Sequence, residues 1–386
     1  MKILILTPHY PPLIGGAEVF SKALANYLAE KGEEVHVVTG RINRTLLDGS
    51  DHQGIEFHRA SLISLQNLVN NNHLYLPTGL PLMLLKSMAL INRKHIDIIH
   101  TVGVYASIMG AFLSKTTNRP YVSTIQGWKL SKYAARNENF LVQGLVRYAI
   151  SHSTMVHCIS SYLEKSARKL GAKKTLIVPN GVYLNRSRNL DNRKLKKKLG
   201  IGEYRIILTA GRLIKTKGIE YLIEALPKVL ERQNNTKLII IGDGPEKPRL
   251  LSLSDELGLR HEVLFLGSIP QDEVFSYMNA SDVFVGPSLF EGLGNVFIEA
   301  MACGTPVIGT SVGGIREIIE NEVNGLLVPP GDSRAIAKAI SRVLSNEDLA
   351  TSLSRNGRKI VEEKFDWDKI CETIYREYPL QLSKTA

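Results

Sequence analysis

The sequence lacks the features typical of secreted and membrane-spanning proteins. Its 386 residues include only three cysteines, Cys158, Cys303 and Cys371, which are far apart and show no metal-binding spacing. Free thiols in a reducing compartment are therefore expected. The apolar start MKILILT is too short for a signal peptide before prolines interrupt it. The most apolar stretch elsewhere, residues 76–94, is broken by prolines and Lys86 and falls short of the roughly 20 apolar residues of a spanning helix. We expect a cytoplasmic protein, soluble or peripheral to a membrane.

Common nucleotide and nucleic-acid motifs are also missing. The segment IIIGDGPEK begins like a dinucleotide fingerprint, but Lys247 stands where the third glycine belongs, and no P-loop Gly-Lys-Ser/Thr follows a strand. The net charge of +11 favours a phosphorylated ligand, an anionic membrane surface or nucleic acid. Because the positive charge is dispersed and has no aromatic residues interleaved with it, nucleic acid is disfavoured.

What the sequence does contain is an alternation of short apolar strands and helix-length segments. Near-continuous apolar strands separated by helices indicate parallel sheets covered on both faces, so the predicted class is α/β with two doubly wound domains. The expected domains are 1–185 and 186–364, hinged near the basic stretch 185–200, and a helix from about 365 to 386 packs back on the first domain. The predicted strands are 3–7, 34–39, 96–102, 121–126, 154–160 and 175–181, followed by 205–211, 237–244, 263–268, 282–288, 305–310 and 325–332.

Two candidate anion sites follow predicted strands, at the carboxyl edge where such sheets bind ligands. Gly15 and Gly16 open a predicted helix over 16–31, where backbone amides could approach an anion, although a glycine pair can also be a simple turn. Arg212 and Lys217 flank the loop GRLIKTKG after the first strand of the second domain. Arginine offers a planar fork to phosphate and lysine a mobile point charge. The alternative is a helix-capping loop with exposed cations.

The segment FEGLGNVFIE carries two acids, Glu291 and Glu299, whose spacing has three interpretations. They could be the acid and nucleophile of a sugar-cleaving enzyme, which requires two carboxyl groups facing each other across a bond. They could bind hydroxyl groups on either side of a phosphate-binding helix start. They could also be a turn residue and a solvated helix acid without chemistry.

The glycines of this segment favour the second interpretation. Gly292 and Gly294 oppose a continuous helix, so a helix from about Asn295 to the stop at Gly304 is predicted. Glu291 then lies in the loop before the helix, and the amides of residues 293–296 form an anion site at its start. Carboxylates do not bind phosphate, so the two acids are expected to hold hydroxyl groups beside a diphosphate.

Together with the N-terminal glycine loop, IGDGPE (241–246) and PNGV (179–182), these motifs resemble the retaining glycosyltransferases of family four. The resemblance spans essentially the whole chain, and the motifs follow one another in the same order as in the family. It implies the GT-B fold, in which two Rossmann-like domains face a central cleft. It also implies transfer of a hexosyl group from a UDP- or GDP-sugar to a carbohydrate or lipid-linked acceptor, with retention through same-face attack. No metal or other cofactor is expected.

The resemblance assigns roles to the residues already singled out. Arg212 and Lys217 would neutralise the diphosphate and stabilise the leaving group. Glu291 would bind hydroxyls of the donor sugar, and these three residues are the expected catalytic residues. Glu299 would hold the ribose. The remaining residues expected to contact the donor sugar, its phosphates or the acceptor are Gly15, Gly16, Gln126, Gly292, Leu293, Gly294, Asn295 and Val296.

One position departs from the family pattern. After the strand YVSTI many relatives carry a histidine that reaches the donor sugar, whereas this chain has Gln126. Glutamine can hydrogen-bond a hydroxyl but carries no charge. Its presence bears on which sugar is accepted.

Two other functions remain open beside the transferase, a nucleotide-sugar epimerase of the same fold and a non-catalytic nucleotide-sugar-binding protein. Contact with an anionic membrane is open as well, because residues 76–94 and nearby cations could form a basic, apolar surface. The nearby cations are Lys129, Lys132, Arg136 and Arg147. The alternative is that residues 76–94 form an ordinary core helix and that the cations lie in a solvated loop.

Overall fold

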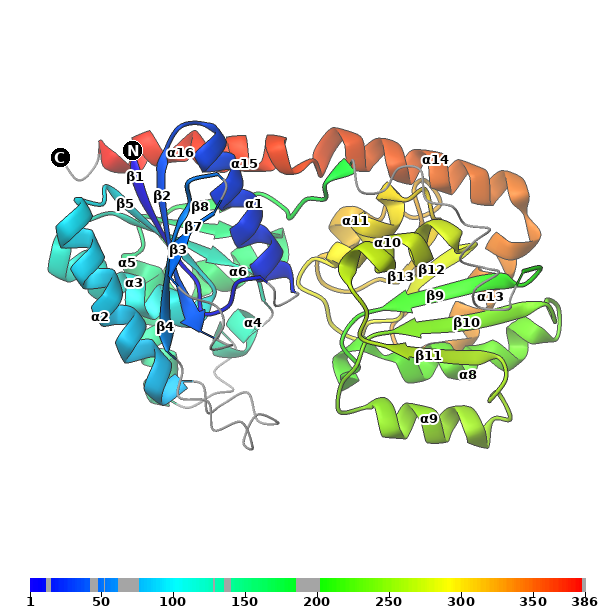
Figure 1. The fold of residues 1–386 in the computed structure, drawn as a ribbon. Helices are drawn as coiled ribbons and strands as arrows, with labels where there is room; N and C mark the ends of the chain where they lie inside the picture. The colour runs from blue at the N-terminus through cyan, green and yellow to red at the C-terminus, as the bar shows by residue number, and fades with distance from the viewer. Residues whose placement is uncertain are drawn as a thin grey trace. The chain divides into compact units, whose positions relative to one another are not determined.

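The chain forms two compact units. The computed structural model describes residues 1–11, 15–41, 48–51, 53–61, 76–127, 129–134, 140–184 and 202–383. One unit comprises Met1–Asn180 and Trp367–Ala386, and the other comprises Gly181–Asp366. These limits lie within five residues of the predicted boundaries. The basic stretch 185–200, expected as the hinge, lies outside the described residues. Figure 1 shows each unit as a sheet with helices packed on it.

The sheet of the first unit is parallel apart from one edge. Among the described residues its strands run in the order β3-β4-β2-β1-β5-β6-β7-β8, and only β3 is antiparallel to its neighbour. All six predicted strands are present, whereas β3 and β4 were missed. The strands are β1 (Lys2–Leu6), β2 (Glu34–Arg41), β3 (Gly49–Ser50), β4 (Glu56–Ser61), β5 (Ile98–Val102), β6 (Tyr121–Ile125), β7 (Met155–Cys158) and β8 (Thr175–Ile177).

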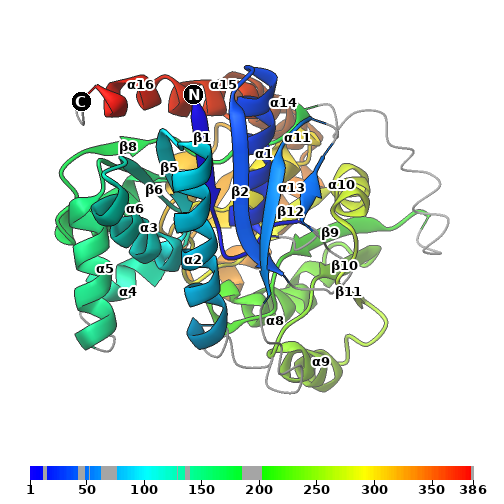
Figure 2. The ribbon, with the colours of Figure 1, turned by 60° about the vertical axis from the view of Figure 1, so that its left-hand side comes forward.

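Helices cover both faces of this sheet. The predicted first helix is confirmed as α1, which buries Phe20, Leu24 and Leu28 at intervals of one turn. Helix α2 packs on β1, β2 and β4 (Figure 2). The helices are α1 (Gly16–Glu30), α2 (Leu76–Lys94), α3 (Val104–Thr117), α4 (Lys129–Ala134), α5 (Phe140–His152), α6 (Ser161–Lys169), α15 (Trp367–Tyr375) and α16 (Glu377–Leu382).

The C-terminal helices complete the core of the first unit. Trp367 of α15 packs its ring on Phe20 of α1, with ring centroids 6.1 Å apart. Tyr378 of α16 is fully buried against the sheet. Residues Trp367 and Tyr378 of the C-terminal segment therefore belong to the core of the first unit.

A chain of hydrogen bonds runs from Tyr378 through the buried sheet. The Tyr378 hydroxyl lies 2.6 Å from His100 Nδ1, and His100 Nε2 lies 2.7 Å from Thr124 Oγ1. Thr124 Oγ1 is 3.0 Å from His157 Nδ1, whose Nε2 is 2.7 Å from the Val178 carbonyl oxygen. A carbonyl can only accept, so His157 Nε2 donates to it. With both rings neutral, Thr124 then donates to His157 Nδ1, His100 Nε2 donates to Thr124, and the Tyr378 hydroxyl donates to His100 Nδ1. Burial lowers the pKa of His100 to about 3 and of His157 to about 4, so both rings are neutral.

The sheet of the second unit is entirely parallel. Among the described residues its strands run in the order β11-β10-β9-β12-β13-β14, and all six predicted strands are confirmed. The strand order reverses between β9 and β12, which makes their carboxyl ends the topological switch point. The strands are β9 (Arg205–Ala210), β10 (Thr236–Ile241), β11 (Val263–Gly267), β12 (Val283–Gly286), β13 (Val307–Thr310) and β14 (Leu326–Val328).

Helices of the second unit enclose an aliphatic core against this sheet. Ile207, Leu238 and Val283 of the central strands pack on Leu222 and Leu226 of α8. Asp332 caps α13, since its carboxylate accepts a hydrogen bond from the Ala335 amide at 2.9 Å. The helices are η3 (Lys215–Lys217, a 3-10 turn), α8 (Ile219–Leu230), α9 (Lys247–Glu256), α10 (Gln271–Ala280), α11 (Asn295–Ala302), α12 (Ile315–Ile318), α13 (Ser333–Ser345) and α14 (Glu347–Lys364).

Candidate active site

The loops at the switch point of the second sheet carry both predicted cations and join one of them, Lys217, to the first predicted acid, Glu291. Arg212 follows β9 and is exposed, and Lys217 ends the short helix η3. Lys217 Nζ forms an ion pair with Glu291 Oε2 in the loop after β12. Ser288 Oγ lies 3.4 Å from the same carboxylate oxygen. The side chains of the pair are only 22% and 17% exposed, so this ion pair is sheltered from water.

The loops after β9 and β12 are joined through their backbones. The Thr216 carbonyl accepts hydrogen bonds from the amides of Leu289 at 2.9 Å and Phe290 at 3.2 Å. Gly218 has a φ of 60°, and a Cβ there would lie 2.3 Å from the Pro287 carbonyl oxygen. Only glycine lets the backbone at position 218 come this close to the Pro287 carbonyl without displacing the main chain. The position of Lys217 beside Glu291 is therefore set by main-chain contacts.

A third loop, after β13, supports the backbone of Glu291. The Gly314 amide donates to the Glu291 carbonyl at 3.2 Å. Gly313 has a φ of 48°, and a Cβ there would lie 1.9 Å from that same carbonyl oxygen. The sequence interpretation gave this pair no role, although consecutive glycines directly after a strand are a readable signal of close backbone approach.

Helix α11 confirms the predicted start and end of the segment after Glu291. It begins at Asn295, and the preceding Gly294 adopts a left-handed conformation with φ of 103°. It ends at Ala302, shortly before Gly304, whose φ is 75°. Residues 292–294 are buried, and residues 295–296 are half-buried. The loop and first turn thus lie at the positive end of the α11 dipole, beside Glu291.

Glu299 lies one turn into α11 and is half-buried. Gln271 Nε2, at the start of α10, donates to Glu299 Oε1 at 3.1 Å. Although part of the residue is exposed, burial of the carboxyl raises the pKa of Glu299 to about 7, against the opposing effect of the Gln271 hydrogen bond. The raised pKa and the hydrogen bond to Gln271 distinguish this carboxyl from that of a fully solvated helix acid. Gln271 was not identified from the sequence.

The other predicted contacts belong to the first unit and follow its strands. Gly15 precedes α1 in an extended conformation, and α1 begins at Gly16. Gln126 follows β6 and forms a reciprocal amide pair with Asn180 of the PNGV motif. Gln126 Nε2 donates to Asn180 Oδ1 at 3.0 Å, and Asn180 Nδ2 donates to Gln126 Oε1 at 2.6 Å. Sequence reasoning had singled out PNGV without giving Asn180 a role.

The apolar stretch 76–94 is the amphipathic helix α2 and not a span. Across the residues that the structure describes, no helix combines the length and apolar character needed to cross a bilayer. Leu82 and Leu85 of α2 are exposed, as are Phe140, Leu145 and Arg147 of α5. The side chains of Lys129 and Lys132, and the whole of Arg136, lie outside the described residues.

Two doubly wound parallel sheets, one with charged loops at its switch point, define the class of fold. A solved structure of sucrose-phosphate synthase from Thermosynechococcus elongatus matches 99% of this chain and 99% of its own, with a TM-score of 0.86 and 26% identity. The fold is GT-B, as the sequence predicted.

Comparison of the sequence with known families then places the chain more closely. Residues 14–186 match the model described as Glycosyltransferase Family 4, and residues 191–360 match Glycosyl transferases group 1. A glycosyltransferase of Methanocaldococcus jannaschii is 32% identical over 99% of both chains. The N-acetyl-alpha-D-glucosaminyl L-malate synthase of Bacillus anthracis is 30% identical over 97% of both. The chain belongs to the family-four glycosyltransferases and is an enzyme of that class.

Proposed function

We propose that the protein is a retaining hexosyltransferase that takes its sugar from a UDP- or GDP-sugar and passes it to a carbohydrate or lipid-linked acceptor. The observation that carries this proposal is the ion pair of Lys217 with Glu291 at the switch point, between the loop that also carries Arg212 and the loop that leads into α11. Two cations suit a diphosphate, and a carboxylate suits sugar hydroxyls. One relative is named as an N-acetyl-alpha-D-glucosaminyl L-malate synthase, which also supports transfer of a hexose derivative.

The cations would act on the charge that develops as the glycosidic bond to phosphate breaks. Arg212 and the ammonium of Lys217 would bind the diphosphate oxygens, and the first-turn amides of α11 would bind the distal phosphate. Without donor, Lys217 is held by Glu291. When the diphosphate binds, it would share the ammonium, and Glu291 would accept hydrogen bonds from the donor sugar. These groups supply the positive charge at the leaving phosphate, so no metal or other cofactor is required in this scheme.

The chemical step would be a same-face displacement. The acceptor oxygen forms its bond to the anomeric carbon as the bond from that carbon to the phosphate oxygen breaks. The acceptor proton passes to the departing phosphate oxygen, and the electron pair of the broken bond stays on the nucleoside diphosphate. Neither Glu291 nor Glu299 needs to act as a covalent nucleophile.

Glu299 would hold the ribose hydroxyls. A carboxylate accepts two hydroxyl hydrogen bonds, whereas the protonated form loses acceptor capacity. With the pKa of Glu299 at about 7 in the free protein, nucleotide binding would favour the ionised form and release a proton. Gln271 would keep the carboxyl oriented through its 3.1 Å hydrogen bond.

The first unit would supply the contacts to the acceptor side. Gly15 and Gly16 at the start of α1 would let backbone approach the donor phosphates or the acceptor. Gln126, held by Asn180, would present its remaining N–H to a sugar hydroxyl.

A donor panel tests the proposal. Purified protein is incubated with UDP-, GDP- and ADP-sugars, with and without acceptors, and free nucleotide and donor sugar are measured. Release of nucleoside diphosphate that depends on an acceptor is expected for one donor. Donor isomerised without acceptor would instead identify an epimerase. Tight donor binding that is unchanged in Arg212→Ala and Glu291→Gln, with no turnover, would identify a binding protein.

We also propose that the protein works in the cytoplasm at an anionic membrane surface, with α5 as the contact. Phe140 and Leu145 are 83% and 52% exposed, and Arg147 lies on the same short helix. Apolar side chains with a nearby cation on a helix suit the interface of an anionic bilayer. Sedimentation with anionic vesicles at two salt concentrations is expected to fall for Leu145→Ser and not for Leu251→Ser, an exposed leucine of the second unit. Equal sedimentation of both variants would exclude α5 as the contact.

A further inference from the structure

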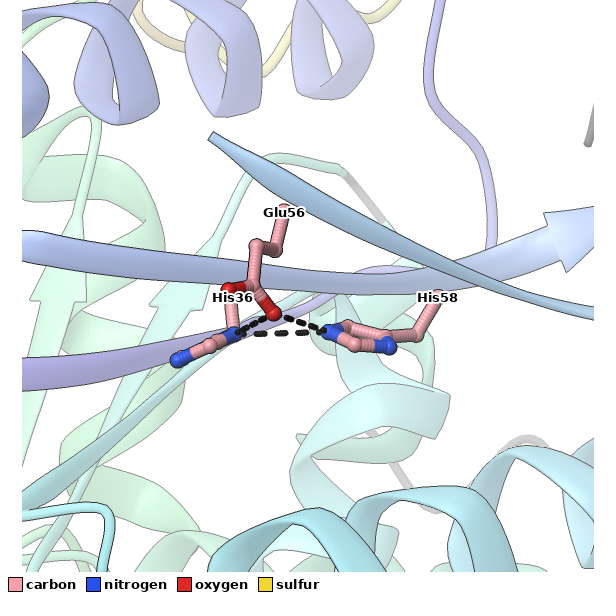
Figure 3. A group of neighbouring side chains, drawn as sticks. All are labelled: His36, Glu56 and His58. Atoms are coloured by element: carbon pink, nitrogen blue, oxygen red, sulfur yellow. Dashed lines mark hydrogen bonds and ion pairs between the residues drawn. The ribbon is translucent and has the colours of Figure 1, made fainter. Parts of the chain in front are cut away.

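A second group of chemically active side chains lies on the first sheet, at the amino ends of β2 and β4. The pattern Glu-x-His occurs on both strands, as Glu34-Val-His36 and as Glu56-Phe-His58. The strands are parallel neighbours, with His36 opposite Glu56 and Val38 opposite His58. Because side chains alternate between the two faces of a sheet, His36, Glu56 and His58 project from the same face. Figure 3 shows their polar atoms converging.

The separations between these atoms match the edges of a small coordination tetrahedron. His36 Nδ1 lies 3.2 Å from Glu56 Oε2 and 3.3 Å from His58 Nε2, and His58 Nε2 lies 3.7 Å from Glu56 Oε2. Ligand atoms about 2.0–2.1 Å from a tetrahedral zinc ion are about 3.3–3.4 Å from one another. Among the described residues, this is the group of histidine, cysteine and acidic side chains whose ligand atoms come this close together.

The two ring nitrogens of His36 face different carboxylates. Nε2 lies 2.9 Å from Glu34 Oε1, so Nδ1 is the atom directed at Glu56 Oε2 and His58 Nε2. An imidazole nitrogen and a carboxylate oxygen can both coordinate a metal ion, and a cation between these three atoms would interact with all of them at once.

The surrounding residues hold the three atoms as an outer shell would. Glu34 orients His36 through Nε2, in the way that carboxylates orient metal-binding histidines. Lys94 Nζ lies 2.9 Å from Glu56 Oε1, so the other oxygen, Oε2, is directed toward the two rings. His36 is fully buried, whereas the side chains of His58 and Glu56 are 17% and 37% exposed and leave a route for an ion to enter.

We propose that His36, Glu56 and His58 form a zinc site, with water as the fourth ligand. Two imidazole nitrogens and one carboxylate oxygen suit zinc and other late first-row divalent ions better than magnesium or calcium. The site lies at the amino ends of its strands, opposite the edge that carries Gly15, Gly16 and Gln126. Its role is therefore structural: the ion ties β4, the neighbour of the edge strand β3, to β2. The inference does not rest on the proposed donor or acceptor.

Zinc retention by the full chain tests this site. Protein without a histidine tag is stripped with a chelator, incubated with one equivalent of zinc chloride and desalted, and bound zinc is measured by mass spectrometry. Wild type is expected to keep one zinc per chain, and zinc is expected to raise its melting temperature. Glu56→Gln and His58→Gln are each expected to bind zinc at least tenfold more weakly and to lose the thermal shift. Glu34→Gln, which loosens the outer shell, should weaken binding about tenfold.

The controls keep the test decisive. His152→Gln removes an exposed histidine of α5 and should behave as wild type. Glu56→Gln preserves shape at a partly exposed position, so it carries the test if His58→Gln fails to fold. Transferase activity should be the same in Glu56→Gln and wild type. Two results would overturn the proposal. One is a wild type that keeps no zinc and shows no thermal shift. The other is zinc that Glu56→Gln and His58→Gln both retain as well as wild type does.

Discussion

Replacing Glu299 by glutamine should stabilise the free protein at neutral and alkaline pH. In the folded state the pKa of Glu299 is about 7, raised from an ordinary value of 4.5 by burial. Ionising this carboxyl therefore costs more in the folded chain than in the unfolded chain. Glutamine keeps the shape and can still accept the hydrogen bond from Gln271, but it never ionises.

The magnitude follows from the pKa shift. A shift of about 2.5 pKa units at about 1.36 kcal/mol each gives an upper limit of about 3.4 kcal/mol. Because Glu299 is partly exposed, water screens part of this cost, and a gain of about 1–3 kcal/mol is expected at pH 8. For a unit of this size that corresponds to a rise in melting temperature of about 2–4 °C per kcal/mol.

The pH dependence gives the sign of the effect. Below pH 4.5 the carboxyl is protonated in both states, and Glu299 does not differ from glutamine. Between 4.5 and about 7 the unfolded chain loses the proton while the folded chain keeps it, so the free energy of unfolding falls as pH rises. Above about pH 7 the loss is complete. The difference between Glu299→Gln and wild type should thus grow from near zero at pH 4.5 to a plateau above pH 7.

Calorimetry of both proteins at pH 5, 6, 7 and 8 measures this difference. Glu256→Gln, at the exposed end of α9, controls for the loss of one negative charge. A difference that is the same at pH 5 and pH 8, or a variant that is less stable than wild type at pH 8, would refute the assignment of a buried, costly carboxylate.

Three further predictions concern the site and the core. Lys217→Ala should lower kcat/KM by about 10²–10³, the usual loss for one charge-stabilising donor, whereas Lys215→Ala, an exposed lysine of the same short helix, should stay near wild type in steady-state assays. Affinity for a nucleoside diphosphate, followed by calorimetric titration, should fall more steeply in wild type than in Glu299→Gln as pH drops below about 7, because only the terminal phosphate of the ligand, with a pKa of about 6, titrates in the variant. Tyr378→Phe leaves His100 Nδ1 without its donor and should lower the free energy of unfolding by about 1–3 kcal/mol in urea titrations.

The sequence predicted those parts of the molecule whose physical cause is local. Strands such as β5 and β12 are buried on both faces, which makes them continuous apolar runs between helices. The start of α11 was predictable because Gly294 breaks the chain just before apolar residues at helical spacing. Arg212 and Lys217 were selected as candidates because they follow a strand.

What was missed depends on contacts between distant segments. Strand β4 (EFHRAS), next to the short edge strand β3, has polar, half-exposed positions and carries no continuous apolar signal. Gln271 approaches Glu299 only through the packing of α10 on α11. The two Glu-x-His patterns meet only because β2 and β4 pair in one particular register. No spacing along the chain shows that register.

The hydrogen-bond chain that starts at Tyr378 also bears on the order in which the protein is made. Its other members, His100, Thr124, His157 and Val178, are all synthesised before the second unit. Tyr378 follows the whole of Gly181–Asp366. Domains usually fold in the order in which they leave the ribosome. Here the unit that emerges first is completed last. The buried His100 gains its hydrogen-bond partner Tyr378 only after the second unit has been translated.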